Sequence, residues 1–276
     1  MDQNIISFAG AGRVASALCK DLFFAGYKIE IIVSESEEGG RSLAGSCNAL
    51  WSSDLMYPDS TKIIFVAVPD RKLVAVLNSI RCSPGTIVVH TAGSFGLDIF
   101  PERIRQKGIF YPLQTFSKNR TISFSRLPVL LESSDESTSS ILEKIAGSLS
   151  SEVHFADTDH RRMLHVAAVF VSNFTNYMLT EGKEIAAKAG FSFEILEPLI
   201  KETILKAIDS GPENSQTGPA IRSDKNTIEK HLELLSFSPG LQKIYNDMTQ
   251  SIIEYYKTKD KSDEGKGPKY SPPGRG

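Results

Sequence analysis

The chain has 276 residues, of which 41% are hydrophobic and 23% are charged, and its formal net charge is −2. This length favours two domains, and the composition is that of an ordinary globular protein. The small net charge gives no electrostatic reason to expect nucleic acid or an anionic membrane surface as a partner. The longest apolar runs are far shorter than the ~20 residues that span a bilayer, so no membrane segment is expected.

The cysteines and the first residues indicate a cellular compartment. Cys19, Cys47 and Cys82 are widely spaced and odd in number, which favours neither a disulfide framework nor a zinc site. Residues 1–4 lack the positive and apolar regions of a signal peptide. We therefore expect a cytoplasmic protein.

The first half of the chain alternates short apolar runs with amphipathic stretches. Strands are expected at 4–9, 28–33, 62–68, 86–90, 108–111 and 128–131, and helices at 13–25, 37–48 and 71–80. Strands that alternate with helices imply βαβ units and a mostly parallel sheet. The predicted α/β fold of residues 1–156 is a doubly wound Rossmann domain.

The second half shows no strand pattern after residue 157. Glycines and prolines divide it into predicted helices at 159–189, 193–210, 223–235 and 239–257. An all-α domain for substrate binding and dimerisation is therefore expected over residues 157–258. Residues 259–276 are rich in charged residues, glycine and proline and are predicted to form a disordered tail.

A glycine-rich turn joins the first predicted strand to the first predicted helix. In this G-x-G-x-x-A pattern Gly10 allows the tight turn, Gly12 lets the backbone approach a pyrophosphate, and Ala15 permits close helix packing. The free N–H groups of the helix N-terminus favour phosphates. The turn predicts a dinucleotide site formed by Gly10, Ala11, Gly12, Arg13 and Val14. The alternative is a plain βα turn that binds nothing.

The end of the second strand indicates which dinucleotide is bound. An acid there bonds the ribose 2′-OH of NAD, whereas its absence and a nearby arginine favour the 2′-phosphate of NADP. Ser34 occupies this position, with Ser36 and Arg41 close by, so the pattern favours NADP. Glu35 would repel a phosphate if it pointed inward, so NAD stays open.

Two further strand ends lie at the sheet edge where such folds bind ligands. Val68 and Pro69 follow the central strand and are expected beside the cofactor, and Asp70 is placed to cap the next helix. His90 ends the following strand. It is predicted to lie near the nicotinamide, although a hydrogen-bonded structural histidine is equally open.

These segments resemble a known group of proteins. The first half is similar to the NADP-binding domain of pyrroline-5-carboxylate reductases, ketopantoate reductases and β-hydroxyacid dehydrogenases. The whole chain resembles oxidoreductases that join a Rossmann-like domain to a helical DUF2520 region. The matching segments are 10–14, 66–70, 90–93, 111–116, 165–170, 172–174 and 217–224, with His231 beyond. The resemblance implies this architecture, a nicotinamide cofactor and a homodimer, but no particular substrate.

The first helix after the Rossmann domain carries the candidate catalytic residues. Related dehydrogenases have a lysine there, which this chain lacks. His165 and, eight residues later, Asn173 are expected to share a helix face. A histidine can give a carbonyl or imine its proton, and an asparagine can orient the substrate. The alternative for His165 is a satisfied core histidine in an apolar stretch.

Two loops complete the predicted substrate site. Gln114 and Thr115 are expected to line the interdomain cleft. Thr217, Gly218 and Arg222 belong to a loop that suits an anionic group of the substrate or cofactor. Capping of the following helix is the alternative role of that loop.

Together these patterns predict an NADP-dependent oxidoreductase. It would transfer hydride between the nicotinamide and a small carbonyl, imine or hydroxy compound in the interdomain cleft. The alternative is a non-catalytic NADP(H)-binding sensor, because the lysine of related dehydrogenases is absent. The expected partners are a small-molecule substrate and a second copy of the chain.

Overall fold

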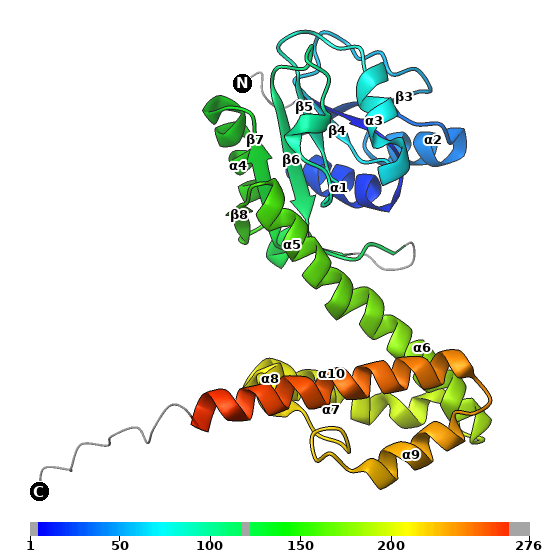
Figure 1. Cartoon of the computed structure of the whole chain (residues 1–276). Helices are drawn as coiled ribbons and strands as arrows, with labels where there is room; N and C mark the ends of the chain where they lie inside the picture. The colour runs from blue at the N-terminus through cyan, green and yellow to red at the C-terminus, as the bar shows by residue number, and fades with distance from the viewer. Residues whose placement is uncertain (1–4, 118–121, 265–276) are drawn as a thin grey trace, which may run out of the picture. The chain divides into compact units, whose positions relative to one another are not determined.

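The computed structural model describes residues 5–117 and 122–264 of the chain. The chain divides into two compact units, with the boundary between Thr175 and Asn176 (Figure 1). The predicted domain boundary, after residue 156, lies just before helix α5 (Thr158–Ala168).

The first unit is built on one eight-stranded sheet with the order β3-β2-β1-β4-β5-β6-β7-β8. All neighbours from β3 to β6 are parallel, β7 pairs antiparallel with β6, and β8 is parallel to β7. The strands are β1 (Ile5–Ala9), β2 (Lys28–Val33), β3 (Leu50–Ser52), β4 (Ile63–Val66), β5 (Ile87–His90), β6 (Lys107–Pro112), β7 (Val129–Ser133) and β8 (Val153–Phe155). This doubly wound, mostly parallel sheet confirms the predicted fold class.

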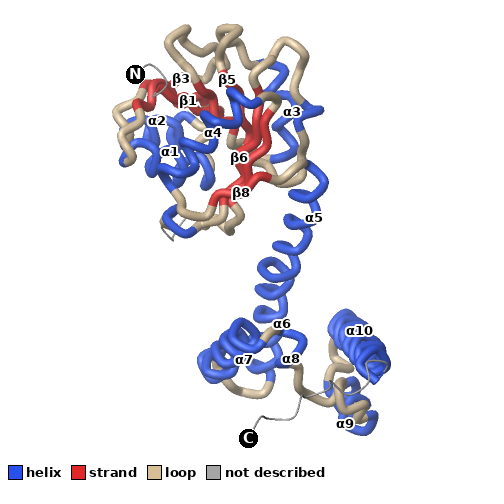
Figure 2. Tube along the Cα trace, turned by 90° about the vertical axis from the view of Figure 1, so that its left-hand side faces the viewer, coloured by secondary structure: helices blue, strands red, loops and turns tan. Residues whose placement is uncertain are grey.

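Helices cover both faces of the sheet, as Figure 2 shows with the strands in red. Leu18, Leu43 and Leu142 pack into a buried cluster on one face, and Leu73 and Leu77 pack into a second cluster on the other. The helices that supply them are α1 (Arg13–Phe24), α2 (Glu37–Ser46), α4 (Glu136–Leu149) and, on the second face, α3 (Asp70–Ser79). The central strands are buried on both faces, which explains why their sequences are continuous apolar runs.

The regular elements in the described residues of the second unit are all helices, joined by turns and loops. Its elements are α6 (Thr175–Lys188), which begins at the boundary, a 3₁₀ turn (Phe193–Leu196), α7 (Glu197–Ser210), α8 (Pro212–Ser215), α9 (Lys225–Leu234) and α10 (Pro239–Glu264). A π-helical segment, Val169–Phe174, joins α5 to α6. The predicted long helix is therefore present, but its π segment was not predicted. No described helix is long and apolar enough to cross a membrane.

Some elements differ from the sequence prediction for identifiable reasons. Strands β3 and β8 have three residues each, too few to show a period. Helix α4 is rich in serine and threonine, which have modest helix propensity. Helix α10 extends through 259–264, part of the predicted tail, because that stretch has no glycine or proline to stop it. Residues 265–276 lie outside the described part of the chain.

Candidate functional site

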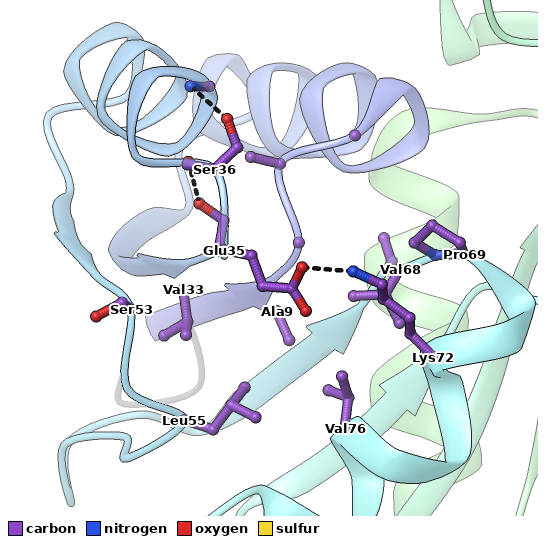
Figure 3. A pocket seen from close by; sticks show the side chains of 16 residues that line it. Ala9, Val33, Glu35, Ser36, Ser53, Leu55, Val68, Pro69, Lys72 and Val76 are labelled. Carbon is purple, nitrogen blue, oxygen red and sulfur yellow. Dashed lines mark hydrogen bonds and ion pairs between the residues drawn. The ribbon is translucent and has the colours of Figure 1, made fainter.

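A pocket of about 300 Å³ opens at the carboxyl ends of β1, β2 and β4 (Figure 3). The strand order reverses between β1 and β4, and doubly wound sheets bind nucleotides at such a switch point. Most of the predicted cofactor residues line this pocket, namely Gly10, Ala11, Gly12, Ser34, Ser36, Val68 and Pro69.

Two glycines of the turn have backbone positions that suit their predicted roles. Gly10 has φ of +109°, and a Cβ at this position would lie 2.3 Å from the Ala67 carbonyl oxygen. Only glycine fits there. Gly12 caps α1, and a Cβ on it would meet no atom within 4 Å, so its backbone faces open space. The turn therefore leaves room for a pyrophosphate at the N-terminus of α1.

Two predicted cofactor residues of this turn are not among those that line the pocket. Arg13 is exposed, and its Nη1 donates a hydrogen bond to the Phe116 carbonyl at 3.3 Å. Val14 is half-buried and packs against the core. Their roles toward a cofactor stay predictions.

His90 is fully buried at the end of β5. Its Nδ1 accepts a hydrogen bond from the Ala92 N–H at 3.2 Å, and its ring stacks on Phe100 at 5.3 Å between centroids. Burial lowers the pKa of His90 to about 4, so the imidazole is neutral at physiological pH. These contacts favour a structural histidine, and the predicted cofactor contact has no support in them.

The two serines after β2 form local hydrogen bonds. Ser34 Oγ accepts from Trp51 Nε1 at 3.1 Å and donates to the Ser36 carbonyl at 2.8 Å. Ser36 Oγ accepts from the Gly39 N–H at 3.2 Å and so caps α2. Both serines thus shape the loop that borders the pocket.

The charged groups near this loop form two ion pairs. Glu35 points across the pocket and pairs with Lys72 of α3 (Figure 3). Arg41 pairs with Glu37 at 2.8 Å and lies over the Trp51 ring, and it does not belong to the pocket lining. Sequence analysis missed Lys72. Lys72 lies in the first turn of the helix that follows Pro69, and this position could have indicated that it borders the cofactor site.

Helix α5 is fixed to the loop that follows β5. Arg161 is fully buried, pairs with Glu132 of β7 and donates to the Phe95 carbonyl. Arg162 Nε donates to the Ser94 carbonyl at 2.9 Å. A buried ion pair that also satisfies backbone acceptors holds its partners in one geometry. These bonds place His165, one helical turn later, over the same loop.

His165 is paired with Tyr111, which lies near the carboxyl end of β6. Tyr111 Oη and His165 Nδ1 are 2.8 Å apart, and the rings meet edge to face with centroids 5.8 Å apart. A Cβ on Gly93 would lie 2.8 Å from Tyr111 Cζ and 2.9 Å from His165 Nδ1. Gly93 therefore leaves the space in which the two rings meet.

The surroundings of Tyr111 keep its hydroxyl protonated. Burial raises the pKa of Tyr111, and the negative charge of Asp70 raises this pKa further. Asp70 is the first residue of α3. The prediction that it caps this helix is wrong, because Pro69 is the N-cap residue and no side chain bonds the helix end. Proline fits the extended N-cap position, and the Asp70 carboxylate faces the positive end of the helix dipole.

Asn173 lies in the π-helical segment and is exposed. In a regular α-helix, eight residues would rotate Asn173 about 80° past two full turns from His165. A π turn contains more residues than an α turn, so it reduces this offset. The π segment therefore places the two residues more nearly on one side of the helix than an α-helix would.

The predicted substrate loops lie in different units. Gln114 and Thr115 are exposed after β6, and the Gln114 side chain accepts from the Thr115 N–H at 2.8 Å. Thr217, Gly218 and Arg222 belong to the second unit. There Asp224 caps α9 by accepting from the Thr227 N–H at 3.1 Å, so the capping role of this loop is confirmed. The substrate roles stay predictions.

Each half of the chain matches the model of a known protein family. Residues 5–93 match the family described as "NADP oxidoreductase coenzyme F420-dependent", and residues 127–252 match "Domain of unknown function (DUF2520)". No curated protein is significantly similar to the chain in sequence.

One solved structure supports the oxidoreductase assignment, and others share the fold. A "putative NADP oxidoreductase" from Bacteroides fragilis is 36% identical, with a TM-score of 0.83 over 92% of this chain and 99% of the relative. A Thermotoga maritima protein is 23% identical over 92% of this chain and 99% of its own, with a TM-score of 0.72. An imine reductase from Myxococcus stipitatus, in complex with NADP⁺, is 16% identical over 94% of each chain, with a TM-score of 0.64. The last two show likeness of fold alone.

Proposed function

We propose a function from the premise that this chain belongs to the family of NADP oxidoreductases that join a Rossmann-like domain to a DUF2520 region. It is an oxidoreductase, and NADP is its cofactor. The reaction we propose is hydride transfer between the nicotinamide and a small imine, carbonyl or hydroxy compound. Similarity to an imine reductase supports the imine as the first class to test.

The glycine turn is our proposed binding site for the pyrophosphate. Open space at Gly12 and the free N–H groups of α1 suit two phosphate groups. The adenosine end would reach the loop of Ser34 and Ser36, where Lys72 is the cation that lines the pocket. When bound, the reduced cofactor supplies the hydride.

The position of the Tyr111–His165 pair carries the proposal. Strands β1, β4, β5 and β6 are parallel, so their carboxyl ends lie at one edge of the sheet. The glycine turn follows β1, Gly93 follows β5, and Tyr111 lies at the end of β6. All three therefore lie at that edge of the sheet. We propose that His165 supplies the proton that the substrate oxygen or nitrogen needs when its carbon accepts hydride. Asn173 would orient the substrate.

We also propose a cytoplasmic homodimer. The odd number and wide spacing of Cys19, Cys47 and Cys82 support a reducing compartment. On α7, Leu199 is 64% exposed and Ile208 is 72% exposed. A second copy of the chain would cover such apolar side chains.

The proposal is tested by turnover of small cyclic imines and aldehydes, followed through nicotinamide absorbance. His165→Ala should lower kcat by about 10²-fold and leave the Kd for NADPH within about twofold, as expected for a lost proton donor. His231→Ala is the matched control, because His231 is also bonded to a tyrosine hydroxyl, that of Tyr245, in the second unit. Equal kcat in wild type and His165→Ala would remove His165 from the mechanism. NADPH binding without turnover of any compound would instead favour a sensor.

A further inference from the structure

The two ring nitrogens of His165 have different surroundings. Nδ1 is 2.8 Å from the Tyr111 hydroxyl, whereas Nε2 has no hydrogen-bond partner among the described residues. The side chain is half-buried. A neutral imidazole has one donor nitrogen and one acceptor nitrogen, so a fixed partner at one nitrogen decides which proton form is present.

We propose that Tyr111 is a positioning residue that donates its hydroxyl proton in a hydrogen bond to His165 Nδ1 and so fixes the tautomer that carries its proton on Nε2. This inference rests on the proposed function for the catalytic role of His165, but the pairing and the tautomer do not depend on it. The tautomer presents an N–H donor to the oxygen or nitrogen of the substrate.

Tyr111 is suited to be the donor of this hydrogen bond. Its ring belongs to a buried cluster with Ile109 and Leu130, and a buried phenol retains its proton. A protonated phenol that faces an imidazole nitrogen donates most favourably when that nitrogen is unprotonated. The opposite arrangement, with Nδ1–H donating to the phenol oxygen, would require another acceptor for the buried hydroxyl proton.

The proton step can be written so that it balances. As the substrate carbon accepts hydride, Nε2 of His165 gives its proton to the neighbouring oxygen or nitrogen of the substrate. At the same time Nδ1 takes the proton of the Tyr111 hydroxyl, so the imidazole stays neutral and the phenolate is transient. A solvent proton then binds Nε2 while Nδ1 returns its proton to the Tyr111 oxygen, which restores the starting tautomer and the protonated phenol. The substrate thus gains one hydride from the cofactor and one proton, and the solvent replaces that proton.

Three contacts hold the pair in place. Gly93 packs directly against both rings, and a side chain there would separate them. Arg161 and Arg162 fix the preceding turn of α5 to the loop of Ser94 and Phe95. The fixed loop and helix leave little freedom for the imidazole to turn, which is the condition for a defined tautomer.

The chain contains a second tyrosine–histidine pair that provides a matched control. His231 Nδ1 and Tyr245 Oη are 2.7 Å apart, with ring centroids 5.6 Å apart. This pair lies between α9 and α10 of the second unit. Tyr245→Phe therefore removes the same hydroxyl from a similar geometry without touching α5 or β6.

The test is nitrogen NMR of the full-length protein with isotope-labelled histidine, without cofactor or substrate. His165→Gln identifies the His165 signals. In wild type at mildly alkaline pH these signals should show one tautomer, protonated on Nε2. Tyr111→Phe should convert them to a mixture of tautomers, whereas Tyr245→Phe should change only the His231 signals. The inference is overturned if Tyr111→Phe leaves the His165 signals unchanged or if wild type is protonated on Nδ1.

Turnover of 1-pyrroline tests the catalytic consequence. Tyr111→Phe should lower kcat by about tenfold or more, with the KM for NADPH unchanged, because the phenyl ring keeps the packing and loses only the hydroxyl. If Tyr111→Phe changes the tautomer of His165 but leaves kcat unchanged, the role of Tyr111 in catalysis is overturned. If His165→Ala itself keeps full turnover, the proposed function of His165 fails, while the NMR result still decides the pairing. The two failures are therefore distinguishable.

Discussion

The two units of the chain differ in how they bury apolar side chains. In the first unit, Phe8, Phe65 and Phe110 are fully buried in a cluster that also contains residues from three helices. In the described part of the second unit, the buried apolar side chains are Ala220, Ile228 and Leu235. The first unit therefore has a core of its own, whereas the helices of the second unit leave large apolar side chains exposed.

This difference indicates that the two units contribute differently to stability and to function. A sheet covered on both faces holds its strand ends rigidly, and the glycine turn, Gly93 and Tyr111 all depend on such ends. Helices with exposed apolar faces need another surface to cover them. The first unit is thus suited to position chemical groups, and the second carries the exposed apolar side chains on which the proposed dimer depends.

The largest expected effect concerns association. Ile204 and Ile208 lie one turn apart on α7 and are 45% and 72% exposed, and Ile204→Asp combined with Ile208→Asp should convert the proposed dimer into a monomer. Both copies of a homodimer carry the two substitutions, so the interface loses four aliphatic side chains of about 2 kcal/mol each, and the dimer Kd should rise by roughly 10⁶-fold. Sedimentation analysis of the full chain measures this change.

A second substitution on α7 serves as the control for this prediction. Lys206→Asp changes an exposed charged residue on the other side of the same helix and should leave the dimer intact. A wild-type protein that is monomeric at all concentrations would show that the second unit is stable with its apolar side chains exposed. The contrast between the units would then not reflect association.

The second effect concerns acid stability and should be confined to the first unit. The pKa of His90 is about 4 in the folded chain and about 6.5 when unfolded, so between these values the unfolded chain binds more protons. Stability from this group is fully present above pH 6.5 and is lost as the pH falls toward 4. The loss amounts to about 3 kcal/mol.

Trp51 allows this loss to be assigned to one unit. It is the single tryptophan of the chain and lies in β3, so its fluorescence follows unfolding of the first unit. Denaturant titrations should give a free energy of unfolding that decreases from pH 6.5 to 4 in wild type and much less in His90→Gln. His231→Gln, in the second unit, should retain the wild-type slope. Equal slopes in all three proteins would argue against the buried neutral histidine.

Much of the first unit could be predicted because burial leaves a local pattern. Continuous apolar runs mark strands covered on both faces, and the Gly10 turn has a fixed spacing relative to the strand before it. The same reasoning selected His165 as a polar residue in an apolar helix. These signals need only a few neighbouring residues.

The features that sequence analysis missed depend on distant contacts. Tyr111 and His165 are separated by 54 positions and meet only because β6 and α5 are adjacent to the loop after β5. Arg161 is buried only because Glu132 is opposite it. The π segment has no recognisable sequence pattern. None of these could be derived from local periodicity, because the strand order determines them.

The smallest expected effect lies within the first unit and concerns the choice of dinucleotide. The Glu35 side chain is 77% exposed, so its ion pair with Lys72 contributes little to stability and a phosphate can replace the carboxylate. We expect Lys72 to bind the 2′-phosphate of NADP. Lys72→Ala should raise the Kd for NADPH about tenfold and that for NADH less than about twofold, because NADH lacks this phosphate.

Two further variants sharpen this test, with all affinities measured by calorimetry. Glu35→Gln should lower the Kd for NADPH, because it removes the carboxylate that competes for Lys72. Arg71→Ala removes an equal charge from the neighbouring position of α3, outside the pocket lining, and should change neither Kd. Equal weakening of NADPH and NADH by Lys72→Ala would place the lysine at a group that both dinucleotides share. The loop of Ser34 and Ser36 would then have to distinguish the two cofactors without a cation.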